Sequence, residues 1–86
     1  MRGADLQVGE VYMAYVGSLA PVVVEQVGAA IPNSGTSRRD GIIVRAMREV
    51  RYEVNRNVVA RRAGDQFVVR NRYVVRLATA EERAEA

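Results

Sequence analysis

The sequence predicts a small all-β protein in which five antiparallel strands form a single domain over residues 1–86. The first observation is the stretch from Gly41 to Val54, where Ile42, Val44 and Val50 share one parity and most charged residues occupy the other. Such a two-residue period is typical of a strand with one buried and one solvated face. The second observation is that the other apolar runs are short, rich in valine and separated by glycine and asparagine, which favour turns.

A helix is the competing prediction for this central stretch, because Ile43, Met47 and Val50 also recur at helical spacing. The strand is favoured because the stretch is rich in β-branched residues, which lose rotamer freedom in a helix. A continuous helix across residues 43–62 would refute the predicted fold.

Two strands are predicted before the main loop, at Val11–Val16 and Val22–Val27, with a short turn between them. Pro21 falls at the beginning of the second strand, where a proline is tolerated. The first strand is apolar on both parities. This is expected either where a small barrel curls over itself or where one face meets another subunit.

The stretch from Gly28 to Gly41 has no period and contains proline, asparagine, serine and glycine, so we expect the main loop there. Arg38 and Arg39 stand side by side near its end, close to hydroxyl and backbone groups that suit an anion. The alternative is that both are solvated loop charges, since their spacing matches no phosphate-binding motif.

The second half of the chain is expected to hold the remaining strands, at Ile42–Val54, Val58–Arg62 and Gln66–Arg70. Asn55 favours a reversal after the long strand, and Gly64 suits a tight turn that needs a positive φ. The last strand continues toward Leu77 either as one bent strand or as two short ones, with the bend at Asn71. Thr79 and Glu82 then have the spacing of a capping box, which predicts a short helical turn over Ala80–Ala86.

The chain is basic, and all of its positively charged side chains are of one residue type. There are 13 basic and 10 acidic residues, giving a formal net charge of +3, and every basic residue is arginine. Arginine forms forked contacts with phosphate and stacks on planar groups better than lysine, which suits a nucleic-acid surface. A GC-rich coding sequence would also favour arginine over lysine without any functional pressure, so both explanations stay open.

The candidate nucleic-acid-binding residues are arginines of the main loop and of strands expected to lie close together: Arg38, Arg39, Arg45, Arg51, Arg61, Arg62, Arg70, Arg72 and Arg76. Arg70, Arg72 and Arg76 share one parity and form a ladder. If these residues share a face, they form a basic stripe that follows phosphates.

Tyr52 and Tyr73 are the candidate stacking groups beside this stripe. The alternative is that both tyrosines pack in the core, because both lie on the apolar parity. Glu49 and Glu53 would also neutralise part of the stripe through ion pairs of small worth, about 0–1 kcal/mol each.

Catalysis is not expected from this composition. The chain has no cysteine and no histidine, which removes disulfides, thiolate nucleophiles, imidazole bases and most zinc sites. We therefore predict no enzyme activity, no cofactor, no metal and no small-molecule substrate, with cleavage of RNA through Tyr, Glu and Arg as the exception to test. The polar first residues and the lack of a long apolar run predict a cytoplasmic protein without a membrane partner.

The opening Leu6–Tyr12, followed by Pro21–Val24, resembles the start of small SH3-like β-barrel proteins found in phages of GC-rich bacterial hosts. The later Arg51–Asn55, then Gly64 and Phe67–Leu77, is similar in outline to the ends of such chains. The chain departs from the pattern in the extra stretch NRNVVARRA that precedes Gly64. The resemblance implies an SH3-like barrel that serves as an interaction module in the host cell interior or the virion, and it carries over no catalytic residue.

Two classes of partner follow from these observations. Nucleic acid, either DNA or RNA, is the favoured class. The alternative is a protein partner or a homo-oligomer, because strands that are apolar on both faces leave exposed hydrophobic area and open sheet edges pair with other chains. Mass in solution tests the second class, and affinity for nucleic acid at two salt concentrations tests the first.

Overall fold

A computed structural model describes residues 5–31 and 39–84 of the chain. These residues form the strands β1 (Val11–Tyr15), β2 (Leu19–Ala29), β3 (Gly41–Ala46), β4 (Val50–Val54), β5 (Asn57–Arg61), β6 (Gln66–Arg70) and β7 (Val74–Leu77), the 3₁₀ turn η2 (Asn71–Tyr73) and the helix α1 (Ala80–Ala84). The predicted all-β class with a C-terminal helical turn is confirmed. The described part of the chain has seven strands where five were predicted, and residues 43–62 form no continuous helix.

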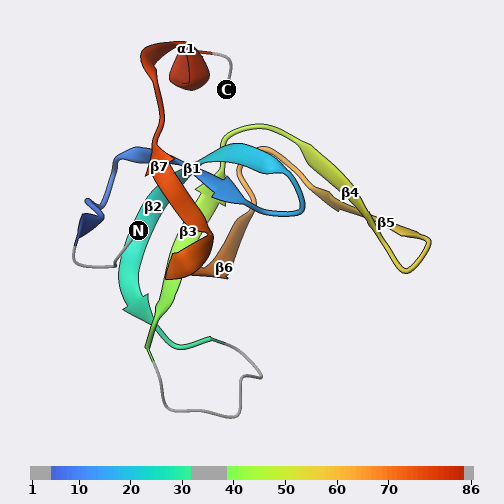
Figure 1. Cartoon of the computed structure of the whole chain (residues 1–86), viewed down its shortest axis with the longest axis horizontal. Helices are drawn as coiled ribbons and strands as arrows, with labels where there is room; N and C mark the ends of the chain where they lie inside the picture. Colours follow the sequence, from blue (N-terminus) through green and yellow to red (C-terminus); the bar gives the residue numbers. More distant parts are fainter. Residues whose placement is uncertain (1–4, 32–38, 85–86) are drawn as a thin grey trace.

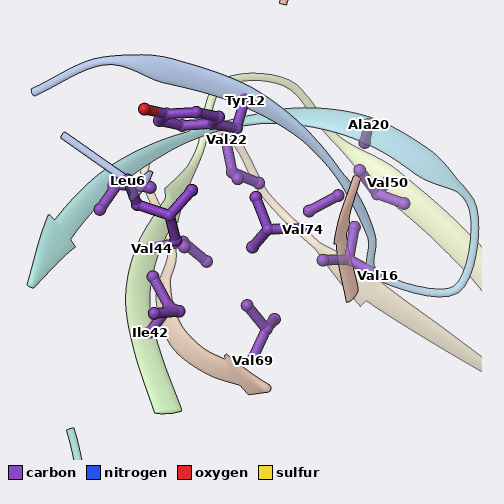
Figure 2. Close-up of a cluster of buried hydrophobic side chains, with 12 residues drawn as sticks. Leu6, Tyr12, Val16, Ala20, Val22, Ile42, Val44, Val50, Val69 and Val74 are labelled. Carbon is purple, nitrogen blue, oxygen red and sulfur yellow. The ribbon is translucent and has the colours of Figure 1, made fainter. Parts of the chain in front are cut away.

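Five of the strands form one antiparallel sheet in the order β6-β3-β2-β1-β7 (Figure 1). Its two edge strands, β6 and β7, follow one another in the sequence and are joined by the three residues of η2. Val69 from β6 and Val74 from β7 belong to the same buried cluster (Figure 2). The sheet therefore curls until both of its edges face one core.

The main core lies inside this curl and is built largely from valine. Val22 and Val24 of β2 and Val44 of β3 have no exposed surface. Because alternate residues of a strand point to one face, this parity of β2 and β3 enters the core while the other parity faces outward. Burying each such side chain contributes about 1.5–3 kcal/mol, which makes the cluster the main source of stability for a chain of this size.

A second, smaller cluster covers the outer face of β1. Val11, Met13 and Ala78 are buried there, and Leu19, Val23 and Met47 pack against them. This arrangement explains why β1 is apolar on both parities. The chain itself covers much of the apolar surface that the sequence assigned either to a curled sheet or to a partner.

The prediction of one continuous strand over Ile42–Val54 is wrong. The strand breaks after Ala46, and β4 begins at Val50 and pairs with β5 in a separate two-stranded sheet. The Ala46 backbone N–H donates to the Asp65 carbonyl at 2.9 Å, and the Gly64 N–H donates to the Ala46 carbonyl at 2.8 Å. These bonds bring the end of β3 directly against the turn that leads into β6, so β4 and β5 form an excursion from the main sheet.

The β4–β5 hairpin extends away from the five-stranded sheet (Figure 1). Asn55 and Arg56 form its turn with φ values of 50° and 67°, so the predicted reversal at Asn55 is confirmed. At the base of the hairpin Val50 belongs to the main core, whereas near the turn Val58 is 70% exposed. The hairpin is thus anchored at one end and solvated at the other.

The remaining predicted turns are confirmed. Gly64 has a φ of 90° in the turn before β6, and Asn71 begins η2, which separates two short strands. At the start of α1, the Glu82 N–H donates to Thr79 Oγ1 at 3.2 Å, and the Thr79 N–H donates to Glu82 Oε1 at 2.9 Å, which is a capping box. None of the helices in residues 5–31 and 39–84 has the length and apolar character that spanning a membrane requires.

Candidate functional site

A cleft of about 460 Å³ lies between the base of the β4–β5 hairpin, the β1–β2 turn and the β6–η2 segment. We call it the aromatic cleft. It is lined by Tyr15, Val16, Gly17, Ile31, Tyr52, Arg61, Phe67, Val68, Val69, Arg70 and Tyr73. Four of these residues are aromatic, in a chain that has only five aromatic residues in total. This concentration of rings makes the cleft the strongest candidate site.

Three tyrosines reach the cleft from separate elements. Tyr15 is the last residue of β1 and is 55% exposed, and Tyr73 is the last residue of η2 and is 41% exposed. Tyr52 comes from β4 and is half-buried against the main core. Both predicted stacking residues, Tyr52 and Tyr73, therefore line the cleft. The alternative prediction, that both tyrosines pack in the core, holds in part for Tyr52, which packs against the main core, and not for Tyr73.

Sequence reasoning missed Tyr15 as a site residue. Its parity in β1 is shared with Val11 and Met13, which are buried on the outer face of the sheet. The signal was its position at the very end of the strand, directly before Val16 and the Gly17 turn, where the alternation of faces stops.

Gly17 lets the Tyr52 ring close one wall of the cleft. A Cβ atom at Gly17 would stand 2.1 Å from Tyr52 Cγ, so only glycine permits this approach. Gly17 also has a φ of 94°, a conformation that other residues rarely adopt. The base of the hairpin is thus packed directly on the β1–β2 turn, which fixes the position of Tyr52.

Two arginines lie over aromatic rings at the cleft. The Arg61 guanidinium carbon is 4.9 Å from the centre of the Phe67 ring, and that of Arg72 is 5.1 Å from the centre of the Tyr73 ring. Arg72 Nη2 also donates to the Tyr73 hydroxyl at 3.3 Å. Each cation–π contact contributes about 0.5–1 kcal/mol at an exposed site, and together they orient both guanidinium groups beside the rings.

The cleft is electropositive. Arg61 and Arg70 are its charged lining residues, and no carboxylate of the described chain lines it. Neither these two arginines nor Arg72 form an ion pair with any carboxylate in residues 5–31 and 39–84. Their N–H donors are therefore available to an external anion at little electrostatic cost.

Three of the other predicted arginines are held by carboxylates of the chain. The ion pairs are Arg45–Glu25 at 3.1 Å, Arg51–Glu49 at 3.0 Å and Arg76–Glu82 at 2.5 Å. Hydrogen bonds from Arg45 and then from Gln66 lower the pKa of the Glu25 carboxyl below its usual range. Arg45 also donates to the Gly64 carbonyl at 2.6 Å, so its role is to join β2, β3 and the turn before β6.

Two further predicted arginines, Arg39 and Arg62, are not among the residues that line the cleft. Arg39 donates to the Gly28 carbonyl at 3.4 Å across the base of the main loop. Arg62 is exposed after β5, where its backbone N–H donates to the Asp65 carboxylate at 2.8 Å. Arg38 lies outside the described residues. The predicted ladder is divided as well, because Arg76 pairs with Glu82 while Arg70 and Arg72 lie at the cleft and η2.

Within residues 5–31 and 39–84, no group of three or more His, Cys, Asp or Glu residues is arranged to hold a metal ion. Protein-family models, curated proteins and solved structures were each compared with the chain, and none of them matches it. The geometry and charge of the aromatic cleft are therefore the features of the chain that bear on its function.

Proposed function

We propose that the protein is a non-enzymatic binding module that contacts nucleic-acid phosphates through the arginines of the aromatic cleft. The observation that supports this proposal is the group Arg61, Arg70 and Arg72, which have no ion-pair partner in the described chain. Arg61 and Arg70 line the cleft, and Arg61 and Arg72 lie over the Phe67 and Tyr73 rings that line it. Phosphate contacts from such arginines release counterions and supply most of the affinity of a nucleic-acid-binding surface.

The proposal narrows the set of binding residues from the nine predicted arginines to these three. Arg45, Arg51 and Arg76 already share their N–H donors with carboxylates, so a phosphate would have to compete with an ion pair. Such competition reduces the net gain from each contact, because the intramolecular carboxylate must first be released to water.

For the fold, we propose a small SH3-like barrel. The curled five-stranded sheet around one core and the long loop after β2 support this assignment. The resemblance to small phage proteins and a location in the host cytoplasm or the virion belong to the same proposal. The stretch in which the chain departs from that pattern coincides with the turn and outer strand of the β4–β5 hairpin, so it adds a hairpin to the sheet without changing its order.

The proposal is tested by replacing Arg70 and Arg72 together with glutamine and measuring affinity for a short nucleic acid at several salt concentrations. A matched control replaces Arg48 and Arg83, which lie outside the cleft lining and carry the same charge. Each lost phosphate contact lowers the slope of log affinity against log salt by about 0.7–0.9.

We expect the Arg70/Arg72 variant to lose about 1.4–1.8 of this slope and the control to keep nearly all of it. Equal losses in the two variants would show that only net charge matters, and unchanged affinity in the first would remove both residues from the site. The absence of enzyme activity is checked by incubating RNA with the protein, since accumulation of cleavage products would contradict a pure binding role.

A second candidate function is protein contact or self-assembly through the β4–β5 hairpin. Val54 and Val58 are exposed near its turn, where the two strands pair only with each other. Isolated two-stranded hairpins are marginally stable in water. Exposed valines on the β4–β5 hairpin therefore favour packing against the surface of another molecule. The mass of the protein in solution tests self-assembly. A monomer at high concentration would reject it, whereas an oligomer that Val58→Ser converts to a monomer would support it.

A further inference from the structure

We infer that the nucleic acid held by this protein is single-stranded and that its unpaired bases stack on Tyr15 and Tyr73 in the aromatic cleft. The inference rests on the proposed function, in which the cleft arginines hold phosphates. It adds the substrate class and assigns the two exposed rings as the groups that recognise bases.

The exposure of these two rings differs from the structural use of tyrosine elsewhere in the chain. Tyr12 is 3% exposed, belongs to the main core and accepts a hydrogen bond from the Gln7 N–H at 2.9 Å. Tyr15 and Tyr73 are 55% and 41% exposed and line the cleft. A buried tyrosine with a satisfied hydroxyl needs only a structural explanation, whereas two exposed rings in one cleft indicate a planar ligand.

Both rings are attached to ordered backbone. Tyr15 is paired with Leu19 in the β1–β2 ladder, and Tyr73 ends the turn that joins the two edge strands of the sheet. The Arg72 guanidinium lies over the Tyr73 ring and donates to the Tyr73 hydroxyl, and these contacts restrict the rotation of the Tyr73 ring. Rings that are held in place lose little further freedom on binding, so stacking retains more of its favourable free energy.

The shape of the cleft favours unpaired bases over a duplex. Inside a duplex each base face is covered by its neighbours, and only the base edges are accessible in the grooves. A base that stacks on a tyrosine must therefore be free of its partner, as in single strands and loops. The volume of about 460 Å³ between hairpin, turn and η2 is a concave space that an unpaired base can enter.

The charges of the cleft suit the backbone on either side of a stacked base. Arg61 comes from β5 and Arg70 from the end of β6, so the two positive groups belong to different strands of its wall. With no carboxylate among the described lining residues, a phosphate meets no repulsion there. Aromatic platforms combined with a basic groove are the usual means of holding single strands without sequence preference.

The test is fluorescence anisotropy with a labelled oligothymidine strand of 12 nucleotides, the same strand without bases, and a duplex of equal length. Parallel measurements with an oligouridine strand cover RNA. The variants are Tyr15→Ala, Tyr73→Ala and the corresponding phenylalanine substitutions, which keep a ring. Leu77→Ala, an exposed apolar residue outside the cleft lining, is the matched control. Thermal unfolding confirms that each variant is folded.

We expect the base-containing strand to bind more tightly than both the abasic strand and the duplex, with a loss of affinity of roughly 5- to 150-fold for each tyrosine-to-alanine variant. The phenylalanine variants and Leu77→Ala should keep the affinity of the parent protein. Equal affinity for the abasic and ordinary strands would overturn the stacking inference and leave phosphate binding intact. Failure to bind any of the strands at low salt would overturn both proposals.

Discussion

Replacing Gly17 by alanine tests how the hairpin is fixed to the sheet. The added Cβ would stand 2.1 Å from Tyr52 Cγ and 2.2 Å from Cδ1, distances that no ordinary contact allows. The alanine would also have to keep a φ of 94°, or else the β1–β2 turn would rearrange. Gly17→Ala therefore introduces two separate costs, one in the backbone and one in the packing of the Tyr52 ring.

The two costs have different magnitudes and different dependence on Tyr52. Holding an alanine in the left-handed region costs about 1–2 kcal/mol. Forcing extra atoms into a packed site typically costs a further 1–3 kcal/mol, so the free energy of unfolding should fall by about 2–5 kcal/mol. In a Tyr52→Gly background the ring is absent together with Tyr52 Cβ, which would itself stand 2.7 Å from the added atom. Only the backbone cost of about 1–2 kcal/mol then remains.

Denaturant unfolding, followed by circular dichroism, of the parent protein, both single variants and the double variant measures this difference as a coupling free energy. We expect a coupling of about 1–3 kcal/mol, with the double variant more stable than the sum of the single effects allows. If Gly17→Ala alone is too unstable to study, recovery of folded protein in the double variant gives the same answer. Additive effects, within about 0.3–0.5 kcal/mol, would show that Tyr52 does not rest on Gly17.

Three further predictions concern the core, the C-terminal helix and the hairpin. Ile42→Ala should lower the free energy of unfolding by about 2–5 kcal/mol, measured with denaturant, because this side chain is among the largest that are fully buried. Hydrogen bonds from Arg76 and then from the Thr79 N–H lower the pKa of Glu82 to about 2. Its stabilising contribution is therefore complete above the ordinary carboxyl range and lost as pH falls from about 4.5 to about 2. The protection of the α1 amides from exchange, relative to the intrinsic rate at each pH, should fall over that range, and Glu82→Gln should remove the change. Val58→Ser should leave the free energy of unfolding within about 0.5 kcal/mol of that of the parent, whereas a larger loss would mean that the hairpin is covered in solution.

Much of the fold follows from local patterns in the sequence. Alternation over Ile42–Ala46 predicts β3, Asn55 and Gly64 mark two turns in the structure, and Asn71 marks the bend between β6 and β7. These features depend on side-chain period and on φ preferences, which are properties of single residues and their close neighbours. The capping box before α1 belongs to the same kind of signal.

The break between β3 and β4 could not be predicted from the same patterns. Ala46 and Val50 are four residues apart and both are buried, so a bend of three residues leaves the two-residue period intact. Whether a strand continues in one sheet or leaves it depends on which strand it pairs with. That choice involves residues distant in the sequence, here Ala46 with Asp65.

The candidate site could be predicted only in part, again because some of its contacts join residues that are distant in the sequence. Arg70 and Arg72 lie in a stretch without acidic residues, from 66 to 80, so the scarcity of carboxylates near them in sequence could be anticipated, although Arg76 of the same stretch pairs with Glu82 just beyond it. The partner of Arg45 could not, because Glu25 stands where the β2–β3 register shifts between Val24 and Gln26. A partner that depends on a bulge cannot be deduced from strand parity alone.

The feature that the sequence patterns missed is also the one that creates the cleft. If β3 continued directly into the turn before β6, the five-stranded sheet would keep its order and most of its core, since the Ala46 and Asp65 backbones already meet there. It would lack Tyr52 on Gly17 and Arg61 over Phe67, which form one wall of the aromatic cleft. The sheet provides stability and the hairpin provides the site. Substitution of Arg61, which lines the cleft and is not part of the main core, should therefore alter binding with little effect on folding, whereas substitutions at Gly17 should alter both.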